Sequence, residues 1–247
     1  MQSNEADIPW ELVRPYGEGD DPWEEGFWCE TFYFARWLLK RPDASTGYAP
    51  LPQLRLSALA AIVPTCYPEL QAAPAEHALL RDLITQHRLA DRSPSRATEA
   101  AVVGLLEQGG YDWMHVVTHG AYFAESALHS SALALEDRQW LACSAITGPR
   151  IRGKLCAERP AFVLNACHAG RTAPLISGAA SWATQLIGSG AGMLIAPLWS
   201  VTDALATQFS QTFYGALLRP EGPATLAEAV WHARTAIRQP DDPTWLA

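Results

Sequence analysis

The sequence has no apolar run that approaches the roughly 20 residues of a membrane-spanning helix. After Met1 it continues with the polar stretch QSNEAD, which lacks the charged and then apolar regions of a secretory signal. Cysteine is scarce: there are five residues, an odd number that does not favour a disulfide framework. We therefore expect a cytoplasmic protein that binds no membrane and whose free thiols persist in a reducing compartment.

The sequence also lacks the marker motifs of several functional classes. No two cysteines are spaced as CxxC, and we expect neither a metal site nor a cofactor. No G-x-S-x-G motif is present, so a serine hydrolase of the α/β type has no nucleophile turn. The glycines of 188–192 follow an expected helix and precede an expected strand, the reverse of a phosphate-binding loop, and we interpret them as a turn.

Positive charge is not concentrated anywhere in the chain. The net charge is −8, and residues 1–30 account for it with nine acidic residues and one basic residue. The remaining residues have equal numbers of acidic and basic side chains, so we expect no direct binding of nucleic acid. We interpret the acidic run as a solvated loop rather than an interaction tail.

What the sequence does contain is a large apolar fraction. Hydrophobic residues make up 49% of the 247 residues, enough for the core of one sizeable domain. Residues 1–53 are an irregular, Trp-rich segment that we expect to belong to the same domain as residues 54–247. From Leu54 onward strand and helix patterns alternate, which predicts an α/β fold with a mostly parallel sheet and helices on both faces. The expected helices cover residues 75–88, 95–108 (with Ser95 as cap), 144–157, 179–188, 203–218 and 224–238.

Two buried strands are predicted to end near each other. The run YDWMHVVTHG ends at His119 and Gly120, and the run RPAFVLNACHAG ends around Cys167. Because ligands bind beyond the carboxyl ends of parallel strands, we expect His119 and Cys167 to face one cleft. A cysteine paired with a histidine is a nucleophile with its base.

This pair would need donors for the oxyanion of an acyl-transfer reaction. Gly120 lets its backbone N–H approach a substrate closely, and the N–H of Cys167 is a second candidate. His168 is a second choice as base, and His115 is expected in the core. The other four cysteines (Cys29, Cys66, Cys143 and Cys156) are interpreted as core residues, because none has such a partner.

These motifs resemble the CHAT domain, a caspase-like peptidase domain related to separase. The resemblance rests on THG at 118–120, NACHAG at 165–170, AGMLIAPLWSVTDALATQFSQTFYGALL, TLAEAVWHARTAIR and IPWELVRPY. It implies a caspase-like three-layer sandwich with His119 as base and Cys167 as nucleophile. It also implies a core that is shorter than usual at both ends and, for the isolated chain, weak or no activity.

The resemblance further implies a substrate pocket. Its walls in caspase-like folds match Asn165 and the segment from Trp199 through Ser200 to Asp203. Neither this segment nor 165–170 contains Arg or Lys, so we expect an uncharged P1 side chain first, a basic one next, and no strict preference for aspartate. Arg171 lies just past the nucleophile, and its side chain would change this P1 preference if it folded back into the pocket.

The expected function is therefore that of a cysteine endopeptidase, a thiol protease working through an acyl-enzyme. The resemblance places it in regulated proteolysis or bacterial defence, with a protein substrate and a sensor or activator as partners. The alternative is a catalytically silent caspase-like scaffold or partner-binding module.

Overall fold

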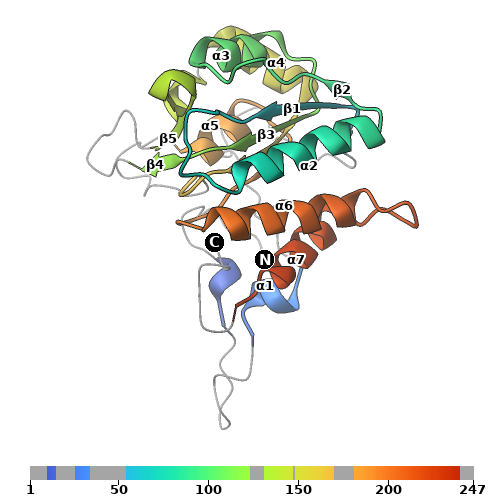
Figure 1. Cartoon of the computed structure of the whole chain (residues 1–247). Helices are drawn as coiled ribbons and strands as arrows, with labels where there is room; N and C mark the ends of the chain where they lie inside the picture. Colours follow the sequence, from blue (N-terminus) through green and yellow to red (C-terminus); the bar gives the residue numbers. More distant parts are fainter. Residues whose placement is uncertain are drawn as a thin grey trace, which may run out of the picture.

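The structure is a computed structural model that describes residues 10–14, 26–33, 54–122, 131–146, 148–169 and 181–239. Its centre is a five-stranded sheet in the order β2-β1-β3-β7-β8, in which every neighbouring pair is parallel (Figure 1). The strands are β1 (Ala58–Ile62), β2 (Ala90–Asp91), β3 (Trp113–Val117), β7 (Ala161–Asn165) and β8 (Met193–Ile195). The predicted mostly parallel sheet is confirmed.

Helices cover both faces of this sheet. One face carries α3 (Glu99–Gln108), α4 (Pro149–Glu158) and α5 (Trp182–Gly188). The other carries α2 (Ala73–Gln86), α6 (Asp203–Leu217) and α7 (Leu226–Ala236). Figure 1 shows α3 and α4 on one side of the strands and α2 and α6 on the other. The result is the expected three-layer α/β sandwich.

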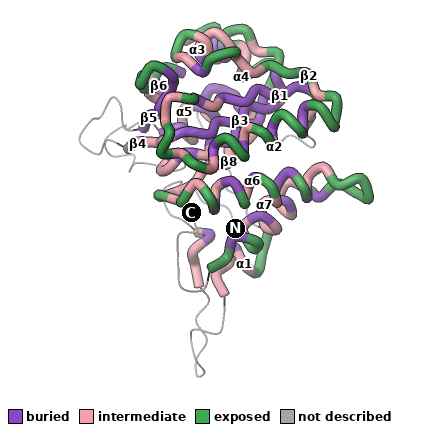
Figure 2. The backbone as a smooth tube through the Cα atoms, viewed as in Figure 1, coloured by how far each residue is buried: buried purple, intermediate pink, exposed green. Residues whose placement is uncertain are grey.

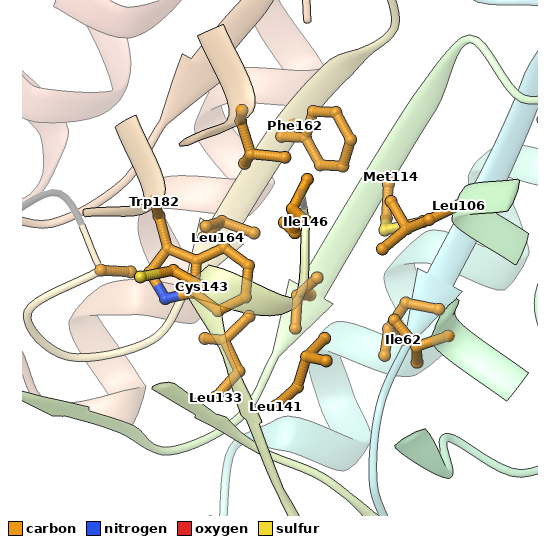
Figure 3. Close-up of a cluster of buried hydrophobic side chains, with 14 of the residues drawn as sticks. Ile62, Leu106, Met114, Leu133, Leu141, Cys143, Ile146, Phe162, Leu164 and Trp182 are labelled. Carbon is orange, nitrogen blue, oxygen red and sulfur yellow. The ribbon is translucent and has the colours of Figure 1, made fainter. Parts of the chain in front are cut away.

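Strands β3 and β7 separate two hydrophobic cores. Residues 113–117 and 161–164 are all buried, as the continuous apolar runs predicted, and Figure 2 shows the central strands in the buried colour. Because side chains alternate along a strand, Met114 and Phe162 face the core under α3, α4 and α5, shown in Figure 3. Trp113 and Val163 face the core under α2, α6 and α7.

A second, antiparallel sheet begins where β3 ends. It is made of β4 (Gly120–Tyr122), β5 (Ser131–Ala134) and β6 (Trp140–Ala142), in that order. The hydroxyl of Thr118 donates to the carbonyl of Ala134 (2.6 Å), and the N–H of Ala134 donates to the carbonyl of His119 (2.9 Å). The chain therefore passes from the main sheet into the small sheet through the residues around His119.

The short elements near the start of the chain contact the last helix. These are η1 (Trp10–Leu12) and α1 (Trp28–Thr31). The indole N–H of Trp231 on α7 donates to the carbonyl of Glu30 (2.8 Å), and Arg238 forms an ion pair with the Glu30 carboxylate (3.0 Å). Cys29 is buried against Leu205 and Ile237.

The predicted helix bounds are off by a few residues, and in two helices the start differs for a clear local reason. Thr98, not Ser95, caps α3: its hydroxyl accepts a hydrogen bond from the N–H of Ala101, and the helix begins at Glu99. The predicted helix at 144–157 is divided into η3 (Cys143–Ala145) and α4, which begins at Pro149. Proline is favoured at the first helical position, where it has no hydrogen bond to lose, so it starts a helix here rather than interrupting one.

The cysteines are not all in the core, contrary to the prediction. Cys29 and Cys143 are buried, but Cys66 is only partly buried and Cys156 is exposed on α4. The pattern of α4 explains the error, because Ile151 and Leu155 form its buried face and Cys156 follows directly after it. Among the described helices, none is both long and apolar enough to cross a membrane.

Candidate active site

The two candidate catalytic residues follow directly from the pairing of β3 and β7. In this register Val117 lies opposite Asn165, and the N–H of Thr118 donates to the carbonyl of Asn165 (3.2 Å). His119 and Cys167 each lie two residues beyond that last pair. The parallel strands thus deliver both residues to the same edge of the sheet, where sheets of this type bind ligands.

Gly120 packs against the backbone of the cysteine segment. A Cβ atom added at this position would collide with the carbonyl oxygen of Cys167 and would also touch the carbonyl carbon of Ala166. Because a backbone carbonyl cannot move aside as a flexible side chain can, only glycine fits here. The close contact brings the two strand ends together at the level of the proposed nucleophile.

The imidazole of His119 contacts two side chains from the loop after β1. Its Nε2 lies 3.2 Å from Oε1 of Glu69, and its ring lies edge-to-face with Tyr67 at a centroid distance of 5.3 Å. A hydrogen bond from the Glu69 backbone N–H, and then the contact with His119, hold the pKa of Glu69 below its ordinary value. Glu69 is therefore an ionised carboxylate beside the histidine.

The small sheet holds this loop in place. Glu136, which follows β5, accepts hydrogen bonds from the N–H (2.6 Å) and the hydroxyl (2.8 Å) of Thr65, and Tyr67 donates to the carbonyl of Leu135 (3.0 Å). Burial raises the pKa of Glu136, but the hydrogen bonds from Thr65 outweigh it and lower the pKa overall. The residues that contact His119 are thus fixed from outside the main sheet.

Cys167 lies in a turn after β7. Its thiol donates to the carbonyl of Val201 in the loop that precedes α6 (Sγ–O distance 3.6 Å). The next residue, His168, has a left-handed backbone (φ 59°), and its Nε2 lies 3.0 Å from the hydroxyl of Ser200. The turn therefore directs His168 toward the loop after β8, while His119 comes from the neighbouring strand.

Asn165 on β7 faces the α2 and α6 side, where it meets a buried carboxylate. Its amide nitrogen lies 2.8 and 2.9 Å from the two carboxylate oxygens of Glu76 on α2. Glu76 is 1% exposed and also contacts His115 Nε2 (2.9 Å), Ser210 Oγ (2.5 Å) and Thr207 Oγ1 (3.3 Å). Tyr214 completes the cluster through its hydroxyl, 2.8 Å from Nδ1 of His115.

This cluster determines the charge and the hydrogen-bond directions of its members. Burial raises the pKa of Glu76, but the hydrogen bonds from His115, Ser210 and Asn165 outweigh it, so its pKa lies below the ordinary value. An ionised carboxylate can only accept hydrogen bonds, so Asn165 must direct its NH₂ group at Glu76. Burial also raises the pKa of Tyr214, which remains a neutral phenol that can donate to His115.

The other residues expected in the substrate pocket have structural contacts of their own. The Trp199 side chain packs against the cluster of Cys29, Leu205 and Ile237. Asp203 accepts a hydrogen bond from the N–H of Ala72 at the start of α2 (2.9 Å), while Thr202 caps α6. Gly170 and Arg171, which the sequence placed next to the nucleophile, lie outside the described residues.

The comparison with protein families agrees with the fold. The model of the CHAT domain family matches residues 6–244, nearly the whole chain. The chain belongs to the CHAT family. The parallel sheet flanked by helices is the caspase-like sandwich expected of a CHAT domain, a family related to caspase-like peptidases. No curated protein matches the sequence.

Part of this CHAT domain's site could not be found from the sequence. Glu69 and Tyr67 come from a loop with no recognisable pattern, so nothing marked them as neighbours of His119. Glu76 did carry a signal, since it shares a helical face with the buried residues Leu80 and Leu83. A charged residue on an apolar helix face needs a buried partner. Within the described residues, no three His, Cys, Asp or Glu side chains are grouped closely enough to hold a metal ion.

Proposed function

We propose that this CHAT domain is a cysteine endopeptidase in which Cys167 is the nucleophile and His119 its general base. The observation that carries the proposal is the register of β3 and β7, which extends both residues from adjacent strand ends. The backbone contact of Gly120 with Cys167 supports it, because it brings the two segments together beside these residues.

The contact with Glu69 supports a specific tautomer of the histidine ring. An ionised Glu69 accepts a hydrogen bond, so Nε2 of His119 carries the proton of the neutral ring. The lone pair then lies on Nδ1, and Nδ1 is the atom we assign to proton exchange with the thiol. Glu69 thereby acts as a positioning residue that orients the base.

The reaction follows from these assignments. His119 Nδ1 takes the thiol proton, and the Cys167 thiolate attacks the carbonyl carbon of the scissile peptide bond. The N–H groups of Gly120 and Cys167 are the proposed donors to the oxyanion. The imidazolium returns its proton to the leaving amine as the C–N bond breaks, which leaves a thioester that water then hydrolyses.

The alternative, a silent scaffold, also has an observation in its favour. The Cys167 thiol donates to Val201, and the hydrogen bond of His119 goes to Glu69 rather than toward the thiol. In unliganded enzymes catalytic hydrogen bonds are often long or misaligned, and they shorten when substrate is bound. We therefore propose that the Cys167 thiol exchanges between Val201 and His119, and that a protein substrate, or an activating partner, favours the contact with His119.

The test measures two properties, peptide cleavage and the reactivity of the Cys167 thiol. It uses purified wild-type protein and the purified variants Cys167→Ala and His119→Ala. Cleavage is followed by mass spectrometry on a mixed peptide library, and alkylation of Cys167 by iodoacetamide is followed as a rate. We expect cleavage to fall by roughly 10³-fold or more in either variant, without further loss in the double variant. His119→Ala should also slow alkylation of Cys167, because the thiolate is the reactive form.

The controls are Cys156→Ala and His87→Ala, which replace an exposed thiol and an exposed imidazole elsewhere. Both should cleave and be alkylated at Cys167 like the wild type. Cleavage that persists in Cys167→Ala would exclude the assignment. No cleavage by any form, together with the same alkylation rate in His119→Ala, would favour the scaffold.

A further inference from the structure

A cavity adjoins the proposed nucleophile on the α6 side of the sheet. Its volume is about 80 Å³. It is lined by Val201, whose carbonyl accepts the hydrogen bond of the Cys167 thiol, and by Asn165, two residues before Cys167. Most of the remaining wall is apolar and includes Ile195, Leu205 and Phe209. A side chain next to a peptide bond held at Cys167 could enter it.

Two polar side chains that line the cavity, Asn165 on β7 and Ser210 on α6, use their donors elsewhere. Asn165 directs its NH₂ group at Glu76, and the hydroxyl of Ser210 also donates to Glu76. The free polar atoms of both residues are therefore acceptors: the amide oxygen of Asn165 and the oxygen lone pairs of Ser210. A carboxylate at this wall would meet acceptors backed by the ionised Glu76, and its desolvation would not be compensated.

One cation, Arg234, lines the cavity from α7. It lies near α1, where its charge acts to lower the pKa of Cys29, although burial raises that pKa overall. A cationic ligand in the cavity would thus share it with Arg234 in largely apolar surroundings. A carboxylate would be attracted by Arg234 but would face the acceptors of Asn165 and Ser210, so the wall as a whole favours an uncharged side chain.

We infer that this cavity is the S1 subsite and that it accepts an uncharged aliphatic P1 side chain of about four heavy atoms. The inference rests on the proposed peptidase function and specifies its substrate class. A water molecule needs about 10–15 Å³ of such volume, and benzene occupies an engineered cavity of about 150 Å³. The size therefore suits Leu or Met and is too small for an aromatic ring.

The experiment measures binding without catalysis. Peptides that are identical except for a C-terminal Leu, Met, Phe, Arg or Glu are titrated into Cys167→Ala protein by isothermal calorimetry. We expect Leu and Met to bind at least about tenfold more tightly than Phe, Arg or Glu. Tightest binding of the Glu peptide, or equal binding of all five, would overturn the inference.

A cavity-filling variant localises the effect. Ala206 on α6 lines the cavity, whereas Ala204, two residues earlier on the same helix, is exposed. In the Cys167→Ala background, Ala206→Phe should abolish the advantage of Leu and Met, and Ala204→Phe should preserve it. If Ala206→Phe does not fold, as judged by circular dichroism, Ala196→Val reduces the same cavity by a smaller amount. An unchanged preference in the folded cavity variant would overturn the inference.

The two proposals fail separately. Cleavage by the wild type after Arg or Glu would refute the subsite assignment and leave the peptidase intact. Selective binding of Leu and Met peptides that is lost on cavity filling, together with no cleavage and an alkylation rate of Cys167 that is unchanged in His119→Ala, would support the subsite and refute the peptidase.

Discussion

Gly120 is a position where one added methyl group would directly disturb the candidate active site. We predict that Gly120→Ala lowers the proposed activity at least about tenfold and destabilises the fold, because the new Cβ collides with the Cys167 carbonyl. Peptide cleavage and the midpoint of urea unfolding measure the two effects. Gly153, inside α4, is the matched control: it has open space around it, so Gly153→Ala should stabilise by about 0.5–1 kcal/mol. Wild-type activity in Gly120→Ala would contradict the close approach of the two strand ends.

The proposed role of Glu69 in orienting His119 can be tested by measuring kcat at different salt concentrations. The contact is solvent-exposed, so we predict that Glu69→Gln lowers kcat by only about two- to fivefold while KM stays near the wild-type value. The imidazolium that forms during the reaction makes an exposed ion pair with Glu69, and because salt screens such pairs, added salt should reduce wild-type kcat toward that of the variant. Steady-state kinetics between about 0.05 and 1 M NaCl would measure this. Glu107→Gln, an exposed carboxylate on α3, should match the wild type throughout; equal salt dependence in Glu69→Gln would exclude the orienting role.

At the scale of elements, Glu76 joins α2 to β3, β7 and α6. Its pKa lies below the ordinary 4.5, so its ionised form stabilises the folded state, and this contribution is present above about pH 4.5. It is lost as the pH falls through the lower folded-state pKa. We predict that Glu76→Gln destabilises the protein by roughly 3–5 kcal/mol at pH 7, and that the difference from wild type narrows toward pH 3. Urea unfolding at each pH measures it.

The control for this element is an exposed glutamate. Glu107→Gln should leave the free energy of unfolding within about 0.5 kcal/mol of the wild type at every pH. A difference between wild type and Glu76→Gln that stays constant from pH 7 to pH 3 would show that shape or packing, not charge, accounts for the loss.

Much of the element pattern was predictable because each strand carries its own signal. The buried strands β3 and β7 were evident from apolar runs, and a helix predicted between them favoured their parallel pairing. The register that aligns Val117 with Asn165 was not, since it depends on contacts between distant segments. Local sequence signals also could not predict that Thr98, rather than Ser95, caps α3, because several residues in that stretch can cap a helix.

The polar cluster around Glu76 could not be predicted from the sequence. Asn165 was placed in the pocket by resemblance, but its orientation is set by Glu76, which lies 89 residues earlier in the chain. His115 was expected in the core and is buried there, yet it takes part in a hydrogen-bonded network rather than in apolar packing. Long-range polar partners of this kind leave little trace in local periodicity.

At the scale of the whole molecule, the beginning and the end of the described chain meet on the α7 side, away from β3 and β1. Trp231 bonds to the carbonyl of Glu30, and its ring contacts Tyr33 edge-to-face (5.8 Å). Cys29 on α1, which directly precedes Glu30, is buried against Leu205 and Ile237, the latter just after α7. The thiol of Cys29 can therefore report whether α1 remains attached to α7.

We predict that Trp231→Ala makes Cys29 reactive while the rest of the fold stays closed. In the wild type, burial raises the pKa of Cys29 and excludes reagents, so its alkylation should be slow. Losing the indole removes its hydrogen bond and ring contact, and local opening of α1 should then speed alkylation of Cys29 by about tenfold or more, measured by peptide mass spectrometry.

Cys143, buried in the other core, is the internal reference, and its alkylation should stay slow. Trp140→Ala, at an exposed indole on β6, should change neither rate. If Cys29 and Cys143 accelerated together in Trp231→Ala, the molecule would be opening as one unit, and the attachment of α1 would not be a separable part of the fold.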